Sequence, residues 1–117
     1  MVRKEMISFR EHMRDGRGTV EIHDILTKEE LDGHGRLYAK VILPPGASIG
    51  WHEHHGETEP YYVLKGEGDF IDSDRSVVHV TAGDVCLIEE GCGHSIENNS
   101  DAVLELMALI YNVEAKQ

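Results

Sequence analysis

Turn signals recur at close spacing through the second half of this 117-residue chain and leave room mainly for short strands. The signals are the segments KGEG (65–68), DSDR (72–75), TAGD (81–84), EEGCG (89–93) and NNSD (98–101). Strand-like segments lie around these turns, at 48–54, 61–65, 67–71, 76–80, 85–88, 94–98 and 102–113. With the first half included, roughly nine short strands joined by Gly-rich turns predict an all-β barrel or sandwich.

The first half adds two strands and one helical turn. TVEIHDIL (19–26) alternates like a strand, and RLYAKVIL (36–43) places its apolar residues on one face. Between them, Thr27 followed three residues later by Glu30 is the capping-box pattern of a short helical turn. We therefore predict helix only near residues 27–31.

The charge of the chain is unevenly distributed. The net charge is −11, yet residues 1–18 carry five Lys/Arg and three Asp/Glu. No repeat, low-complexity tract or linker interrupts the remainder, so we predict an N-terminal arm (1–18) and a single domain (19–117). A basic arm on an acidic body indicates that the arm docks on the body or on a second copy of it. A loosely attached terminus is the alternative.

Several classes of function are disfavoured by the composition. No basic patch with interleaved aromatic residues is present, so nucleic acid is not expected as a partner. No apolar run approaches the roughly 20 residues of a membrane helix, and residues 1–18 lack the apolar stretch of a secretory signal. Cys86 and Cys92 do not form a CxxC pair. We therefore predict a cytoplasmic protein with reduced cysteines.

A cluster of ionisable side chains stands at residues 52–59, in the sequence HEHHGETE. His52 and His54 are two apart on a predicted strand and so leave the same face, whereas His55 points away. The turn that follows can present either Glu57 or Glu59 back toward the histidines. Two imidazoles and a carboxylate are the outline of a metal site, and a solvated polar edge is the alternative.

Two longer spacings then match a known family. The first, G(X)5HXH(X)3–4E(X)6G, is met by Gly46, His52, His54, Glu59 and Gly66. The second, G(X)5PXG(X)2H(X)3N, is met by Gly83, Gly91, His94 and Asn98, with Glu89 at the position of the proline. Over residues 46–98 the chain resembles the cupin superfamily. It is similar to the small single-domain conserved-barrel members (cupin 2 type, oxalate-decarboxylase-like).

The resemblance implies a fold and a metal site. The fold is a double-stranded β-helix (cupin or jelly-roll) barrel of two antiparallel sheets. The site holds one divalent metal ion through His52, His54, Glu59 and His94, and the match therefore selects Glu59 over Glu57. Four ligands leave about two positions of an octahedral ion open, which favours Mn(II) or Fe(II). Zn(II), Ni(II) and Cu(II) are alternatives.

The other matched positions are predicted to serve the fold. The four glycines match turn positions with a conformational role, and Asn98 is expected to be structural and not a ligand. Glu89 in place of proline loosens the turn before His94 or adds a surface charge, without removing a ligand.

Two classes of function follow from such a site. The first is a metalloenzyme of the oxygenase, decarboxylase or isomerase type, acting on a small, oxygen-rich molecule. The alternative is a non-catalytic cupin that binds or senses a small ligand. The lid glutamate of oxalate decarboxylation has no counterpart that we can place, so no catalytic residue is assigned. The resemblance also implies a homodimer with exchanged outer strands and arms, which the charge contrast between arm and body supports.

Several other residues lie close to the two motifs in the sequence. Tyr61 and Tyr62 are predicted to pack as strand aromatics, with a cavity-facing role for one of them as the alternative. Cys92 is expected to be a small residue in a Gly-rich turn, with metal binding or oxidation as the alternative. Cys86 is predicted to be in the core. The remaining histidines considered are expected to be surface or packing residues: His12, His23, His34 and His79.

Overall fold

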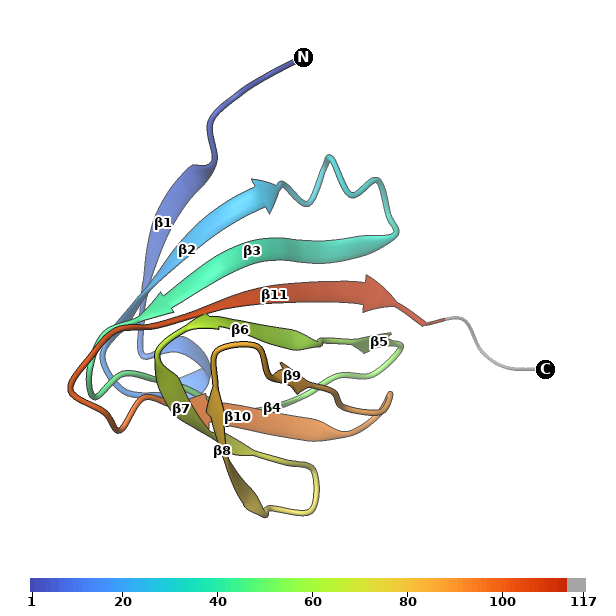
Figure 1. The fold of residues 1–117 in the computed structure, drawn as a ribbon. Coiled ribbons are helices and arrows are strands. Elements are labelled where there is room, and N and C mark those ends of the chain that lie inside the picture. Colours follow the sequence, from blue (N-terminus) through green and yellow to red (C-terminus); the bar gives the residue numbers. More distant parts are fainter. Residues whose placement is uncertain (114–117) are drawn as a thin grey trace.

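Strands form nearly all the regular structure of residues 1–113, which are the residues that the computed structural model describes (Figure 1). In chain order the elements are β1 (Met6–Glu11), the 3-10 helix η1 (Met13–Asp15), β2 (Thr19–Leu26), β3 (Gly35–Leu43), β4 (Ser48–Glu53), β5 (Glu57–Thr58), β6 (Tyr61–Lys65), β7 (Glu67–Ile71), β8 (Val77–Thr81), β9 (Val85–Cys86), β10 (Gly93–Glu97) and β11 (Leu104–Asn112). The prediction of an all-β chain is confirmed.

Two antiparallel sheets face each other, as predicted. The larger sheet has the strand order β1-β2-β3-β11-β6-β9, with β5 paired to β11, and the smaller has the order β4-β10-β7-β8. Strand β11 is central because its alternate residues are buried: Leu104, Leu106, Ala108 and Ile110 face the other sheet. The core between the sheets is aliphatic, with Tyr61 and Phe70 as its buried aromatic residues within the described part of the chain.

The predicted arm contains an edge strand. Residues 6–11 form β1, which pairs antiparallel with β2 from Met6 opposite Asp24 to Glu11 opposite Thr19 (Figure 1). Glu5 also contacts the ring of His23, with Oε1 2.8 Å from Nδ1. The arm of this chain therefore docks on its own body. Sequence periodicity alone missed this strand because most of its residues are exposed.

The prediction of helix near residues 27–31 is wrong, because the segment forms a turn and no regular helix. Thr27 and Glu30 do form the reciprocal capping-box hydrogen bonds, at 2.9 and 3.2 Å. Asp32 and Gly33 then adopt φ of 53° and 81°, which ends the helical geometry after a single turn. The helical segment of residues 1–113 is instead η1. No helix in that span is long and apolar enough to cross a membrane.

Asn98 and the four motif glycines serve the fold, as predicted. Asn98 is fully buried, and its side-chain amide donates to the carbonyl oxygens of Leu43 and Ala102 at 2.9 and 2.8 Å. It thereby joins the ends of β3 and β10 to the start of β11. The four motif glycines have φ between 83° and 95°, which confirms their conformational role: Gly46, Gly66, Gly83 and Gly91.

Candidate metal centre

Three histidines and one glutamate from three segments of the chain converge between the two sheets. His52 lies in β4 and His54 just after it, Glu59 lies between β5 and β6, and His94 lies in β10. The Nε2 atom of each histidine lies 3.1 Å from Oε1 of Glu59. The register explains this arrangement, because His52 and His94 are direct partners in the β4–β10 pair. The four candidate ligand atoms all lie within 4.8 Å of one another and all four residues are buried.

The hydrogen bonds of two of the rings, those of His52 and His54, leave their Nε2 lone pairs directed at Glu59. The Nδ1–H group of His52 donates to the carbonyl oxygen of Gly50 at 2.8 Å, and that of His54 donates to Glu57 at 2.9 Å. In the neutral rings Nε2 is then an acceptor. Nε2 of His94 lies only 3.0 Å from Nε2 of His52. Two acceptors so close together beside a carboxylate oxygen suit a shared cation, so the donor set fits a divalent metal ion.

Glu57 supports the cluster from behind. Its carboxylate accepts hydrogen bonds from Arg36 at 2.7 to 3.2 Å and from the Nδ1–H group of His54. A carboxylate that receives the second ring N–H of a histidine fixes the orientation of the ring and raises the basicity of the other nitrogen. Glu57 is therefore outside the cluster, as the family resemblance implied, and it positions His54.

The pKa shifts of Glu59 and His94 match the charge states that metal ligands need, whereas that of His54 opposes them. Burial opposes the charge on Glu59, but the three imidazole rings that contact its carboxylate outweigh burial and hold its pKa well below the usual range. Burial lowers the pKa of His94, which keeps that ring neutral. His54 is also desolvated, yet the carboxylates of Glu59 and Glu57 outweigh this and raise its pKa. One carboxylate therefore stays ionised and the fully buried ring of His94 stays neutral, whereas a metal ion must displace the proton of His54.

Comparison with protein families matches residues 39–110 to the Cupin domain family. The matched span is more than half of the chain and contains all four residues of the cluster. The chain belongs to the cupin family.

The cupin has relatives that match most of its length. An oxalate-binding protein of Thermotoga maritima is 48% identical over 99 residues, which are 85% of this chain and 81% of the relative. The solved structure of a predicted oxalate decarboxylase from Thermotoga maritima has a TM-score of 0.89 at 43% identity, covering 97% of this chain and 99% of that one. A cupin 2 conserved barrel domain protein from Salinispora arenicola has a TM-score of 0.59 at 28% identity, covering 65% and 62%.

Tyr61 differs from the prediction that both tyrosines pack as ordinary strand aromatics. Tyr62 is half exposed, but Tyr61 is fully buried and packs its ring on His94, with ring centroids 4.7 Å apart and an angle of 11° between the planes. Its hydroxyl has no hydrogen-bond partner among residues 1–113. Burial raises the pKa of this hydroxyl well above its usual range, and the charge of Glu59 adds to the effect. Tyr61 therefore forms part of the site wall, which was the less favoured alternative.

The other histidines and cysteines that were possible metal ligands lie outside the cluster. His55 is exposed, as strand alternation predicted. Cys92 is not among the four residues of the cluster, and its carbonyl oxygen accepts from the amide of His54 at 3.1 Å. Cys86 is in the core, where burial raises the pKa of its thiol to about 11. His23 packs between Glu5 and Glu21, consistent with a packing role.

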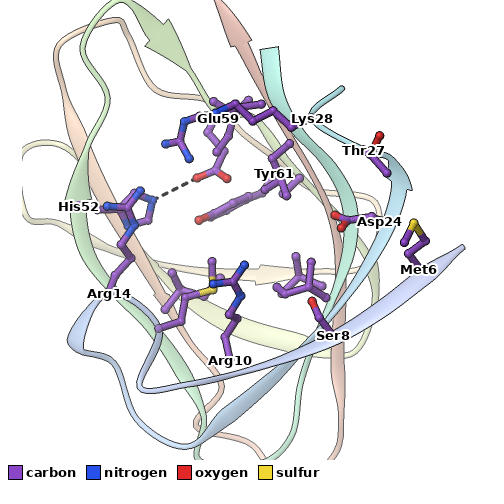
Figure 2. A pocket seen from close by; sticks show the side chains of 18 of the residues that line it. Met6, Ser8, Arg10, Arg14, Asp24, Thr27, Lys28, His52, Glu59 and Tyr61 are labelled. Atoms are coloured by element: carbon purple, nitrogen blue, oxygen red, sulfur yellow. Dashed lines mark hydrogen bonds and ion pairs between the residues drawn. The ribbon is translucent and has the colours of Figure 1, made fainter. Parts of the chain in front are cut away.

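A cavity of about 720 Å³ leads to the cluster of the cupin. His52, Glu59 and Tyr61 line it, and Figure 2 shows all three directed into the same space. Its lining contains four basic and four acidic residues, although acidic residues outnumber basic ones by 22 to 11 in the whole chain. The basic ones are Arg10, Arg14, Lys28 and Arg36. The cavity is thus less negative than the protein as a whole, which suits an anionic ligand.

Residues of the N-terminal arm complete this cavity, and the sequence search for metal ligands missed them. Met6, Ser8 and Arg10 of β1 and Met13 and Arg14 of η1 all contribute to the lining. The excess of positive charge in residues 1–18 is the sequence signal that could have indicated Arg10 and Arg14.

Proposed function

We propose that this cupin binds one divalent metal ion through His52, His54, Glu59 and His94, and that the ion receives a small, oxygen-rich carboxylate of the oxalate class. The convergence of three imidazole Nε2 atoms on one carboxylate oxygen carries the proposal. The name of the Thermotoga maritima relative, an oxalate-binding protein, supports the class of ligand. Mn(II) and Fe(II) are the favoured ions, because a mixed nitrogen and oxygen set with open positions suits both.

Each residue of the site has a distinct part in this function. Glu59 neutralises one of the two charges of the ion, and the three histidines set the geometry. Glu57 holds His54 in place through the hydrogen bond to Nδ1. A bound ion would act as a Lewis acid with about two positions for ligand oxygens or water. The ring of Tyr61 on His94 excludes water from one side of the cluster.

Titration calorimetry tests the proposal directly. Metal-free protein titrated with Mn(II) should bind one ion per chain, and the loaded protein should then bind oxalate. Metal-free protein should bind oxalate far more weakly, because the ligand would then meet the Glu59 carboxylate without a cation between them. Protein that takes up no metal under any loading condition would overturn the proposal and leave the fold unaffected.

Turnover is the second candidate function, as a metal-dependent decarboxylase, oxygenase or isomerase. The buried hydroxyl of Tyr61 supports it, because this O–H donor is next to the cluster and has no partner within the described residues. A screen with Fe(II) or Mn(II), under air and under argon, separates the candidates. Metal-dependent oxygen consumption or release of carbon dioxide supports the enzyme, whereas tight binding without product supports the binding protein.

We also propose a homodimer that forms through the outer face of the larger sheet. Met6, Ser8 and Arg10 of β1 line the cavity, so Ile7 and Phe9 project from the opposite side, where they are 55% and 63% exposed. Apolar side chains of β3, β6 and β11 lie on this outer face as well, among them Tyr62 at 47% exposure. A second copy of the chain would cover them.

The cytoplasm remains the proposed location. Cys86 and Cys92 are both free thiols, which suits a reducing compartment. Fractionation of cells that express the chain from its own promoter would test this.

A further inference from the structure

Two arginines of the cavity have no partner for their charge within residues 1–113. The side chains of the other four arginines are engaged by acidic or aromatic groups: Arg3 with Glu30, Arg17 with Glu97, Arg36 with Glu57, and Arg75 on the ring of Trp51. Arg10 and Arg14 show no ion pair or side-chain hydrogen bond in the described structure, and both line the cavity. Figure 2 shows their guanidinium groups directed into it from β1 and η1. In a chain with twice as many acidic as basic residues, two arginines without an acidic partner are available to bind an anionic ligand.

The loop that presents Arg14 has an unusual backbone. His12, Arg14 and Asp15 have φ of 50°, 54° and 62°, in the left-handed region that non-glycine residues rarely adopt. Three such residues within four positions persist only where the surroundings hold them, and this kind of strain is typical of ligand sites. The loop is held by backbone bonds, among them the amide of His12 to Gly18 at 2.9 Å and the amide of Gly16 to Met13 at 2.9 Å.

Gly50 joins this loop to the metal centre. A Cβ atom at position 50 would lie 2.0 Å from the carbonyl oxygen of Arg14, so only glycine lets the loop approach β4 this closely. The carbonyl oxygen of the same Gly50 accepts the hydrogen bond that orients the ring of His52. One residue therefore contacts both the backbone of Arg14 and the ring of a candidate metal ligand. The position of Arg14 relative to the cluster is built into the backbone.

The charges of the site explain why an arginine is needed there. A divalent cation beside the ionised Glu59 leaves a net charge of about +1, which one monoanionic ligand balances. A dianion such as oxalate leaves a net charge of about −1 in a largely buried site. A guanidinium group at the wall of the cavity compensates it through charge-assisted hydrogen bonds, for which the planar arginine fork suits a carboxylate.

From these observations we infer that Arg14, held by the strained loop on Gly50, is the residue that selects dianionic over monoanionic carboxylates at the metal centre. Arg10 assists from β1. The inference rests on the proposed function and deepens it, because it assigns the second charge of the ligand to a named side chain outside the cluster.

The test compares two chelating ligands on manganese-loaded protein by titration calorimetry. Oxalate is a dianion, and glycolate chelates with one carboxylate and one hydroxyl. Arg14→Gln should weaken oxalate binding at least about tenfold, because it removes charge-assisted hydrogen bonds. The same variant should change glycolate binding by less than about threefold. Arg17→Gln is the matched control, since Arg17 has the same charge but points to Glu97 outside the cavity, and it should change neither affinity.

The outcomes separate this inference from the proposed function. Wild-type protein that binds manganese but not oxalate overturns both. If wild-type protein binds oxalate and Arg14→Gln binds it equally well, or loses both ligands to the same degree, only the selecting role of Arg14 is wrong. Arg14→Lys provides a second measurement, because it keeps the positive charge but loses the planar fork of the guanidinium group. Selective loss of oxalate in Arg14→Gln, with partial recovery in Arg14→Lys, supports the inference.

Discussion

Replacing His94 by alanine tests the metal centre most directly. His94 is fully buried, and it reaches the cluster from a strand 35 residues away from Glu59. Its Nε2 atom contacts both Glu59 and His52, so His94→Ala removes one of four candidate ligands and leaves the other three in place. The matched control is His55→Ala, because His55 is adjacent to the site in sequence but exposed.

The size of the effect follows from linkage between metal binding and folding. Loss of even an indirect contact to a metal ligand weakens binding about 10–100-fold, so loss of the ligand should weaken it at least about tenfold. At a metal concentration of 100 times the wild-type dissociation constant, binding adds about 2.7 kcal/mol to the free energy of unfolding. A tenfold weaker site adds only about 1.4 kcal/mol under the same conditions. For a domain of this size the difference is roughly 4–8 °C in melting temperature.

Thermal unfolding with and without Mn(II) measures this quantity. The metal-induced rise in melting temperature is compared within each variant, which cancels the direct effect of the lost packing between His94 and Tyr61. His94→Ala should lose about half of the wild-type rise, and His55→Ala should keep all of it. A full rise in His94→Ala would show that the ion binds elsewhere, and the proposed centre would then be wrong.

Three further predictions concern the surroundings of the site. Glu57→Gln should lower metal affinity by roughly 10–100-fold in calorimetry, because the amide orients His54 less strongly; unchanged affinity would exclude a supporting role. The ring N–H groups of His23 donate to the carboxylates of Glu21 and Glu5, which raises the pKa of His23, so its contribution to stability is complete below about pH 6.5 and is lost as the pH rises through the raised value. The melting temperature of wild type should therefore fall more steeply above neutral pH than that of His23→Gln, and parallel profiles would contradict this. Deletion of residues 1–18 should weaken the dimer in sedimentation experiments, and an unchanged dimer would refute the role of the arm.

Much of the site was predictable because it depends on local rules and on fixed spacings. Strand alternation placed His52 and His54 on one face and turned His55 outward, and the structure has all three in those positions. The choice between Glu57 and Glu59 was beyond strand alternation, since a turn can present either residue. It was the family spacing that selected Glu59, and the structure places Glu59 at the centre of the cluster.

Other features depended on contacts between distant segments, which no local pattern encodes. The capping box of Thr27 and Glu30 formed as expected, but the segment stays a turn, and Asn112 of β11 donates hydrogen bonds to the carbonyl oxygens of Gly33 and His34 at its end. Tyr61 has the same strand pattern as an ordinary core aromatic, and only its stacking on His94 makes it part of the site. The predicted arm became an edge strand because β2 offered a free edge for pairing.

The sequence by itself determined that this chain forms short antiparallel strands and that four particular side chains are suited to share one metal ion. Both results follow from chemistry carried by single residues and by spacings within the chain: alternation along strands, glycine at turns, and nitrogen and oxygen donors at family positions. Only the tertiary structure decided what surrounds the candidate metal centre. Arg14 lies at the cavity because a strained loop packs on Gly50, 36 residues away along the chain. Such proximity results from the pairing and packing of whole strands, so it becomes visible only once the barrel has closed.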